Sequence, residues 1–310
     1  MAATPKYPKY IWMDEEFVPF DQATVHVLSP CARNAANVFE GIRGYWNSDA
    51  NQLFCFRLPE HYKRLLESMR IMHMELPYST ENHIEFLLET LRKNEIREDV
   101  HIRHQVLVNG VGFFSATEPV SMFIATMPRQ SSPQIEKGIR CCISAWTRIS
   151  DDSVPPRVKA GSNYQNSRLA QIWARKYGFE DAILLNANGK VAEGPAACLF
   201  MVRNGTLATP SVTQGILESV TRDTIIELAQ KEIGMAVIER EIDRTELYVA
   251  EEAFFVGTAA EVKPIIEIDG FRLKSLDSGS LTRRIQRCYF DVARGYNPKY
   301  AQWLTPVYGE

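Results

Sequence analysis

Apolar residues in the first 130 positions recur first with helical and then with strand spacing. Leu58-Pro59 places a proline in the favoured first turn of a helix. The apolar face that follows has helical periodicity: Tyr62, Leu65, Leu66, Met69 and Met72. Ser79-Thr80 is typical of a helix start, and a second apolar face follows it: Ile84, Leu87, Leu88 and Leu91. Apolar runs then predict strands at 100–108 and 120–127.

The second half of the chain also alternates between strand and helix patterns. A strand is expected near 139–146, and a helix from 163 to 176 that ends at Gly178. The remaining expected elements are helices at 221–231 and 280–293 and strands at 237–242 and 253–256. This order predicts a mixed fold of helices and sheets, α/β in the sense that includes α+β.

Two Asn-Gly pairs predict hairpins. Asn188-Gly189 separates strand-like residues 181–186 and 190–193, and the pair favours a type I′ turn. Asn204-Gly205-Thr206 matches a glycosylation acceptor. Because no secretory signal precedes it, we interpret it as a second hairpin turn.

A proline-flanked polar segment divides the chain. Pro128 to Pro133 is the best candidate for a linker. We therefore expect a small α/β domain at 1–128, an interdomain linker at 129–137 and a large domain at 138–310. A cleft between two such domains is a common position for a ligand site.

Composition excludes several classes of function. The net charge of −3 and the dispersed basic residues argue against a nucleic-acid or anionic-membrane partner. No apolar stretch is long enough to cross a bilayer, and the first residues lack the apolar core of a signal peptide. The six cysteines have no metal-binding spacing, so we expect no metal site, reduced thiols and a cytoplasmic location.

Lys159 and Glu193 carry the most informative chemistry. Lys159 lies in a glycine-containing loop between a strand-like and a helix-like segment, where its amine can form a Schiff base with an aldehyde cofactor. A carboxylate on a later strand, such as Glu193, can pair with a protonated pyridine nitrogen. These are the two protein groups that pyridoxal phosphate chemistry most needs. Taken singly, each is more often an exposed surface residue.

Two further segments could bind an anion. Residues 217–223 begin a helix, whose free N–H groups and dipole suit a phosphate, although a threonine cap is the commoner use of such a sequence. The segment Gly257-Thr258-Ala259-Ala260 could offer backbone N–H groups and a hydroxyl, or could simply form a tight turn.

Taken together, these segments resemble the branched-chain-amino-acid aminotransferases, which belong to the pyridoxal-phosphate fold type IV group. The resemblance extends from Tyr10 to about Trp303. The matching stretches are residues 24–29, 38–43, 56–57, 159–164, 193–194, 220–223 and 257–262. The order of these dispersed motifs makes chance agreement negligible.

The resemblance implies a role for each matching position on the cofactor side. Lys159 would hold pyridoxal 5'-phosphate as a Schiff base and then move a proton, and Glu193 would keep the pyridine nitrogen protonated. Tyr164 would bind the phenolate oxygen of the cofactor, and Arg57 would bind its phosphate. The phosphate site would be completed by the Val220 and Thr221 amides and the Thr258 hydroxyl.

The resemblance also implies the substrate side. The amides of Thr258 and Ala259 would face the substrate carboxylate. Arg103 would receive the distal carboxylate of glutamate or 2-oxoglutarate. The pocket would be lined by Phe39, Gly41 and Arg43.

The chain departs from the family pattern mainly at substrate positions. His101 replaces a family tyrosine. It could be a carboxylate partner, a pH-sensitive group or an ordinary histidine of the pocket wall. Asn34 stands where a family tyrosine reaches across the dimer, and the alternative is that it only caps a turn. Arg129 replaces family aromatic residues. It would favour an anionic side chain if it faced the cleft, but we interpret it as a solvated linker residue.

The cofactor side departs less. Ala197-Cys198 replaces a family Glu-Asn pair, and Ser219 replaces a glycine. His101 and His104 face opposite sides of a strand, which makes them a poor metal pair.

These observations predict an aminotransferase that moves an amino group between an L-amino acid and a 2-oxo acid. The amino acid is expected to be branched-chain-like, with glutamate and 2-oxoglutarate as one pair. An unusual polar amino acid is the alternative substrate. A D-amino-acid aminotransferase, a lyase of the same fold and, last, a non-catalytic binding protein are the alternative functions. The resemblance further implies a homodimer or a higher homo-oligomer.

Overall fold

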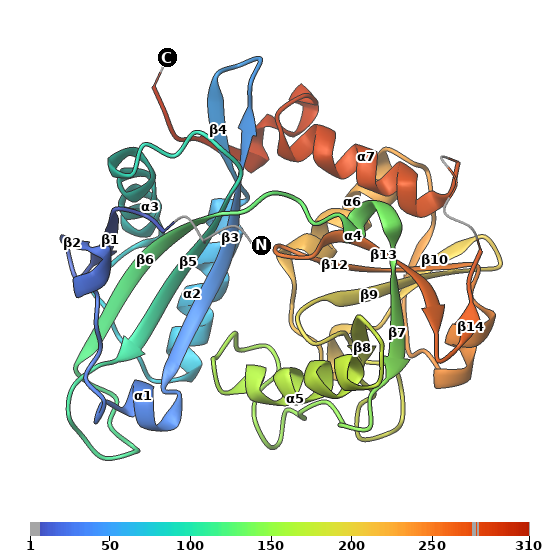
Figure 1. Cartoon of the computed structure of the whole chain (residues 1–310), viewed down its shortest axis with the longest axis horizontal. Helices are drawn as coiled ribbons and strands as arrows, with labels where there is room; N and C mark the ends of the chain where they lie inside the picture. Colours follow the sequence, from blue (N-terminus) through green and yellow to red (C-terminus); the bar gives the residue numbers. More distant parts are fainter. Residues whose placement is uncertain (1–6, 275–276, 278, 310) are drawn as a thin grey trace. The chain divides into compact units, whose positions relative to one another are not determined.

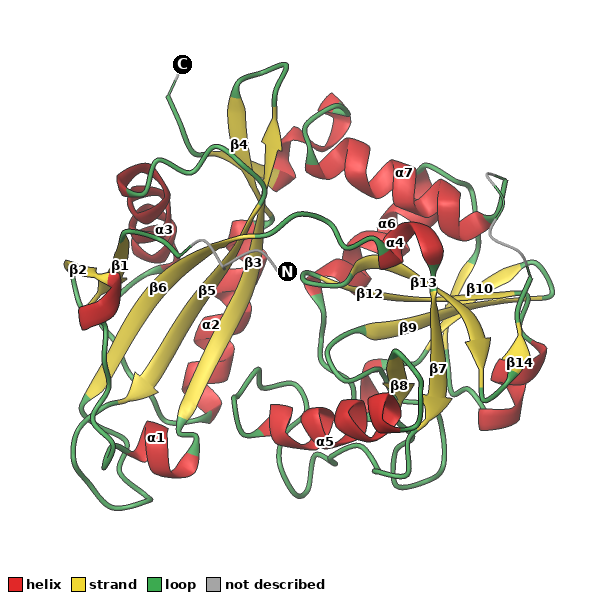
Figure 2. Ribbon diagram, in the orientation of Figure 1, coloured by secondary structure: helices red, strands yellow, loops and turns green. Residues whose placement is uncertain are grey.

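The computed structural model describes residues 7–274, 277 and 279–309 of the 310-residue chain. These residues form two units. The first contains the chain up to Gln130, together with Val158–Ser162 and the residues from Val292 onward. The second contains Ser131–Arg157 and Asn163–Asp291. Helices and strands occur in both units, so the expected mixed fold is confirmed (Figures 1 and 2).

The first unit is built on an antiparallel sheet whose described strands follow the order β15-β4-β3-β5-β6-β1-β2. Its strands are β1 (Tyr10–Met13), β2 (Glu16–Pro19), β3 (Asn37–Asn47), β4 (Gln52–Phe56), β5 (Val100–Val108), β6 (Val120–Pro128) and β15 (Leu304–Pro306). The long strand β3 lies between β4 and β5. The strands expected at 100–108 and 120–127 are confirmed as β5 and β6.

Two helices of the first unit pack against this sheet and against each other. They are α2 (Leu58–Ile71) and α3 (Thr80–Lys93), and both are confirmed where the apolar spacing places them. Ser79 caps α3, because its hydroxyl accepts from the Asn82 amide while the Asn82 side chain accepts from the Ser79 amide. Shorter turns of helix are α1 (Pro30–Asn34), η1 (Phe20–Gln22) and η4 (Pro298–Trp303).

The second unit contains a mixed sheet with the described strand order β11-β10-β9-β12-β13-β7-β8, and β14 pairs with β13. Its strands are β7 (Ile139–Ile143), β8 (Asp181–Ile183), β9 (Cys198–Arg203), β10 (Thr206–Thr209), β11 (Val237–Glu239), β12 (Glu252–Gly257), β13 (Glu261–Ile268) and β14 (Phe271–Arg272). The strands expected at 139–146 and 237–242 are therefore shorter than the sequence pattern suggests, since β7 ends at Ile143 and β11 ends at Glu239.

Helices of the second unit cover this sheet (Figure 2). Small side chains of α5, Ala170 and Ala174, are buried against it. They are α4 (Gln134–Lys137), α5 (Asn163–Lys176), α6 (Val220–Lys231) and α7 (Leu281–Ala293, of which Val292 and Ala293 belong to the first unit), with the 3-10 turns η2 (Val212–Gln214) and η3 (Arg244–Val249). The helices expected at 163–176, 221–231 and 280–293 are confirmed as α5, α6 and α7.

The two Asn-Gly turns differ. Asn204 and Gly205 both have positive φ, and Arg203 pairs with Thr206, as a two-residue type I′ hairpin requires. At the other turn only Gly189 has positive φ. The Asn186 carbonyl accepts from the Gly189 amide, and the Asn186 side-chain Oδ1 accepts from the Lys190 amide. The type I′ prediction for Asn188-Gly189 is therefore wrong: this is a three-residue loop that ends in a left-handed glycine.

Within the described ranges, no helix combines the length and the apolar character that crossing a membrane requires.

Candidate active site

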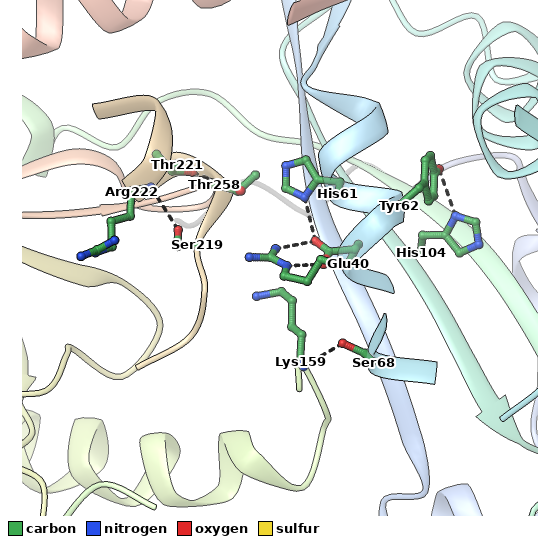
Figure 3. A network of polar contacts seen from close by, with 11 residues as sticks. Glu40, His61, Tyr62, Ser68, His104, Lys159, Ser219, Thr221, Arg222 and Thr258 are labelled. Atoms are coloured by element: carbon green, nitrogen blue, oxygen red, sulfur yellow. Dashed lines mark hydrogen bonds and ion pairs between the residues drawn. The ribbon is translucent and has the colours of Figure 1, made fainter. Parts of the chain in front are cut away.

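Lys159 is held by its own backbone. Its amide donates to the Ser68 hydroxyl of α2 at 3.3 Å, and its carbonyl accepts from the Phe39 amide of β3 at 2.9 Å (Figure 3). Gly161 follows closely, and a Cβ at that position would lie 2.6 Å from Oδ1 of Asn37. A side chain at position 161 would therefore force the lysine loop away from β3. The sequence places a reactive amine on a loop, and the structure shows how the loop is fixed.

The side chain of Lys159 is half-buried, and its Nζ lies 5.1 Å from the centroid of the Phe39 ring. Arg103 packs on the same ring, with its guanidinium carbon 3.2 Å from the centroid. Its Nε and Nη2 both donate to Oε1 of Gln105, at 2.9 and 2.8 Å. Phe39 thus lies against two basic side chains. The family resemblance assigns Lys159 to the cofactor and Arg103 to the substrate.

His101 lies on the same strand as Arg103 and on the same face. β3 and β5 pair so that Arg43 is opposite His101 and Gly41 is opposite Arg103. A Cβ on Gly41 would lie 3.0 Å from Cε1 of His101, so the glycine makes room for the imidazole. His104 is fully buried on the opposite face, where its Nδ1 lies 3.1 Å from the Tyr62 hydroxyl.

His101 is a neutral histidine among cations. Burial lowers its pKa to about 3, with further contributions from the charges of Arg129, Arg43, Arg103 and Lys159. Its Nδ1 is buried and has no hydrogen-bond partner within the described residues. The side chain of Arg129 is exposed, as expected for a linker residue, yet its charge reaches His101.

Glu40 lies fully buried on β3, between Phe39 and Gly41. Nε and Nη2 of Arg64 donate to its two carboxylate oxygens, each at 2.7 Å, and Nδ1 of His61 lies 2.7 Å from Oε2 (Figure 3). Burial raises the pKa of Glu40, but Arg64 and His61 outweigh it and hold that pKa well below its usual range. The pKa of His61 is lowered, chiefly by burial and in part by the charges of Arg64 and Lys159. Because a lowered pKa favours the neutral imidazole, the positive charge that balances the Glu40 carboxylate comes from Arg64.

Arg57 is fixed at the start of α2. Its backbone is left-handed, with φ of 54°, and its amide donates to the Trp303 carbonyl at 2.7 Å. The guanidinium lies 4.7 Å from the Trp303 ring, and Nε donates to Oε1 of Glu60 at 2.8 Å. A non-glycine residue in this conformation carries backbone strain, which the surrounding contacts must offset.

Glu193 occupies the second unit, where both of its carboxylate oxygens have partners. Nη2 of Arg148 lies 2.7 Å from Oε1, and the side chains of both residues are buried. Oε2 accepts from the Leu217 amide at 3.2 Å and from the Cys198 thiol at 3.7 Å. The carboxylate therefore has an arginine as its charge partner and is fixed in orientation.

The start of α6 presents backbone donors. Ser219, and not a threonine, is the cap: its hydroxyl accepts from the Arg222 amide at 3.2 Å. The first amides of a helix have no partner within the helix, which leaves those of Val220 and Thr221 available to an anion. The hydroxyls of Thr221 and Thr258 lie 3.5 Å apart, so two hydroxyls also point at this helix start (Figure 3).

Comparison with known proteins identifies the family. Residues 37–268 match the class IV amino-transferases. A probable branched-chain-amino-acid aminotransferase from Aquifex aeolicus is 40% identical over 303 residues, which cover 96% of this chain and 97% of that protein. The chain belongs to the class IV aminotransferases.

Solved structures agree with this assignment. The branched-chain amino acid aminotransferase of Thermobaculum terrenum in its PLP-form has a TM-score of 0.91 and 41% identity, with 98% of this chain and 99% of that chain covered. The branched-chain aminotransferase of Thermoproteus uzoniensis, solved with norvaline, has a TM-score of 0.92 and 40% identity and covers 97% and 100%. The fold type IV class, the enzyme assignment and pyridoxal phosphate as the cofactor are thus confirmed.

The residues of this aminotransferase fit the cofactor that the family uses. A half-buried amine at Lys159, a buried and charged carboxylate at Glu193 and a helix start with two threonine hydroxyls match its aldehyde, pyridine and phosphate groups. The other predicted site residues lie at Tyr164 in the first turn of α5, at Ala259 after β12 and at Asn34, exposed at the end of α1. Their individual roles stay predictions, although Ala35, not Asn34, is the residue that caps α1.

Sequence reasoning missed three residues of this aminotransferase: Arg148, Arg64 and His61. Each contacts a buried carboxylate, Glu193 or Glu40, from a distant part of the chain. Arginine and histidine occur throughout the sequence, so only the structure singles these three out.

Proposed function

We propose that this aminotransferase transfers the amino group of a branched-chain-like L-amino acid to a 2-oxo acid, with glutamate and 2-oxoglutarate as one pair. The observation that carries the proposal is a half-buried amine at Lys159 in a chain that also holds Glu193 as a buried carboxylate. Pyridoxal phosphate, when bound, supplies an electron-withdrawing ring that accepts the electrons released at Cα of the substrate.

Residues of the chain would bind both the pyridine ring and the phosphate group of this cofactor. Glu193 would keep the pyridine nitrogen protonated, and the Tyr164 hydroxyl would donate to the phenolate oxygen. Arg57 and the Val220 and Thr221 amides would bind the phosphate, because guanidinium and helix N–H groups both suit that anion.

Lys159 would then act as the acid and base. Its amine would take the proton from Cα of the amino acid and return a proton at C4′ of the cofactor. The Thr258 and Ala259 amides would orient the substrate carboxylate, which fixes the Cα–H bond relative to the ring.

On the substrate side, Arg103 is the candidate for the distal carboxylate of glutamate. Its guanidinium is held flat on Phe39 and can present N–H groups to an anion. Phe39, Gly41 and Arg43 would line the same pocket, in which Phe39 offers an apolar surface to an aliphatic side chain.

A polar amino-acid side chain is a second candidate, and one observation favours it. The buried Nδ1 of His101 meets no partner within the described residues, and four cationic side chains contribute to lowering the pKa of that ring. A substrate with an oxygen-bearing side chain could supply the missing hydrogen bond, whereas an aliphatic chain could not.

The experiment is a spectral titration. The purified protein with pyridoxal phosphate is mixed in turn with glutamate, leucine and a panel of polar amino acids, and loss of the bound-aldehyde absorbance is followed. Discharge by glutamate and leucine supports the proposal, and faster discharge by a polar amino acid supports the second candidate. Release of pyruvate without any keto acid would indicate a lyase, and absence of cofactor binding would contradict the proposal altogether.

We also propose that the protein is a homodimer. A group of large apolar side chains lies exposed in the first unit, before α1 and in the loop after β5: Val27, Leu28, Val111, Phe113 and Phe114. Nη1 of Arg33 in α1 donates to the Gly112 carbonyl at 3.2 Å, which joins the two segments. Exposed apolar groups of this kind favour association. Light scattering of a Phe113→Ser/Phe114→Ser variant tests it: the dimer should weaken.

The location that we propose is the cytoplasm. All six cysteines have free thiols, which suits a reducing compartment.

A further inference from the structure

Arg148 is fixed on all sides before any cofactor is considered. Its amide donates to the Leu185 carbonyl at 2.8 Å. Nε donates to the Gly215 carbonyl at 3.0 Å, Nη1 lies 3.4 Å from the Ser167 hydroxyl of α5, and Nη2 lies 2.7 Å from Glu193. Each nitrogen of the guanidinium thus contacts a different segment of the second unit, and only one of those contacts is a carboxylate.

The Arg148–Glu193 pair is buried on both sides, with side-chain exposures of 5% and 6%. A buried ion pair stabilises a protein weakly, because desolvation cancels most of the attraction between the charges. A buried carboxylate without a cation, in contrast, takes up a proton. The pair therefore needs an explanation other than stability, and the chemistry of Glu193 provides one.

We propose that Arg148 is a positioning residue for the cofactor: it keeps Glu193 ionised and correctly oriented, so that Glu193 can hold the pyridine nitrogen protonated. This inference rests on the proposed function, in which Glu193 is the partner of that nitrogen. Arg148 occupies Oε1, while Oε2 already accepts from the Leu217 amide and the Cys198 thiol. These bonds fix the orientation in which the carboxylate can meet the ring.

The consequence is selective. Loss of Arg148 would weaken the contact of Glu193 with the ring nitrogen, because a protonated or rotated carboxyl no longer attracts an N–H⁺ group. It would leave the phosphate contacts at α6 and the amine of Lys159 in place. A purely structural role for Arg148 would instead weaken every cofactor contact to a similar extent.

The test compares two ligands on one protein. The dissociation constants of pyridoxal phosphate and of its carbon analogue, in which C–H replaces the ring nitrogen, are measured for each apo-protein by fluorescence titration. The change in this ratio between wild type and a variant reports the Glu193–nitrogen contact, because the intrinsic differences between the two ligands cancel in that comparison. Wild type should prefer the natural cofactor by about tenfold or more, as expected for a charge-assisted hydrogen bond. Glu193→Gln should lose this preference.

Arg148→Met should lower the ratio toward that of Glu193→Gln, and Arg148→Lys should restore part of it because it keeps the charge. Arg240→Met is the matched control, since Arg240 pairs with Glu246 elsewhere in the second unit; it should keep the wild-type ratio. The inference is overturned if Arg148→Met also keeps that ratio while Glu193→Gln loses it. A wild-type protein with no preference would overturn the Glu193 assignment and this inference together.

Discussion

Arg64 binds Glu40 through two parallel hydrogen bonds of 2.7 Å, and the carboxylate is completely buried. The pair joins α2 to β3, the strand next to which Lys159 is fixed. Because both charges lie inside the protein, removal of one leaves the other without compensation.

Glu40→Gln should therefore destabilise the protein by about 3–5 kcal/mol, the range for breaking a buried ion pair. Arg64 would keep its charge in a buried site and lose one acceptor oxygen. Urea unfolding followed by tryptophan fluorescence measures the change. The control is Glu180→Gln, which removes a half-exposed pair with Arg140 and should cost no more than about 1 kcal/mol. Equal losses of unfolding free energy in the two variants would show that the buried Glu40 pair stabilises the protein no more than an exposed pair does.

Acid should destabilise the first unit through its buried histidines. His83 is fully buried, stacks on Tyr62 with 5.3 Å between ring centroids, and has no partner for its ring nitrogens within the described residues. Burial lowers its pKa to about 4. Between this value and the ordinary histidine pKa of about 6.5, the unfolded chain binds more protons than the folded chain. Stability is therefore complete above this window and falls as the pH falls through it.

The loss between pH 7 and pH 5 should be about 2 kcal/mol for His83 alone, from the linkage between pKa and stability. His83→Phe keeps an aromatic ring but cannot titrate, so its unfolding free energy should fall less over the same pH interval. His73→Asn, at an exposed position with positive φ, is the control and should follow wild type. A His83→Phe variant with the full wild-type pH dependence would contradict the assignment.

The sequence predicts those parts of the fold that local spacing determines. Leu58-Pro59 and Ser79-Thr80 mark the starts of α2 and α3 because a first-turn proline in one case and a capping serine in the other lie within a few residues of the apolar face. Partners far apart in the chain have no such signal. Arg64 lies 24 residues from Glu40, and nothing near either residue indicates the pair.

The same limit applies to the candidate site. Lys159 and Glu193 are predicted because their chemistry is distinctive and because the motifs resemble a known family. Arg148 is not predicted, since its importance comes only from the carboxylate that it meets in the folded chain. Nor does the local pattern predict that Val158–Ser162 and the residues from Val292 onward pack with the first unit. A turn type, such as that at Gly189, depends on how the flanking strands pair.

Lys159→Ala should lose transamination by about a thousandfold or more, in the range for removing a positioned acid-base group. The variant lacks the one amine that would both hold the cofactor and move the proton. Single-turnover spectra with glutamate measure the effect. Ser68→Ala, which removes only the hydroxyl that accepts from the Lys159 amide, should reduce the rate far less. Robust turnover by Lys159→Ala would overturn the lysine assignment.

His101→Tyr should shift the preference of the enzyme toward aliphatic amino acids. The wild-type imidazole is neutral at neutral pH and offers a polar nitrogen. The tyrosine ring offers a larger apolar surface, and its hydroxyl lies at the end of the ring farthest from the backbone. The expected change in the ratio of kcat/KM for leucine to that for a polar amino acid is about tenfold, the lower range for pocket discrimination. His101→Phe distinguishes the effect of the ring from that of the hydroxyl. A similar shift in both variants would assign the effect to the apolar ring. A shift in His101→Tyr alone would assign it to the hydroxyl. An unchanged ratio in both variants would show that position 101 does not select the side chain, and the polar-substrate candidate would lose its supporting observation.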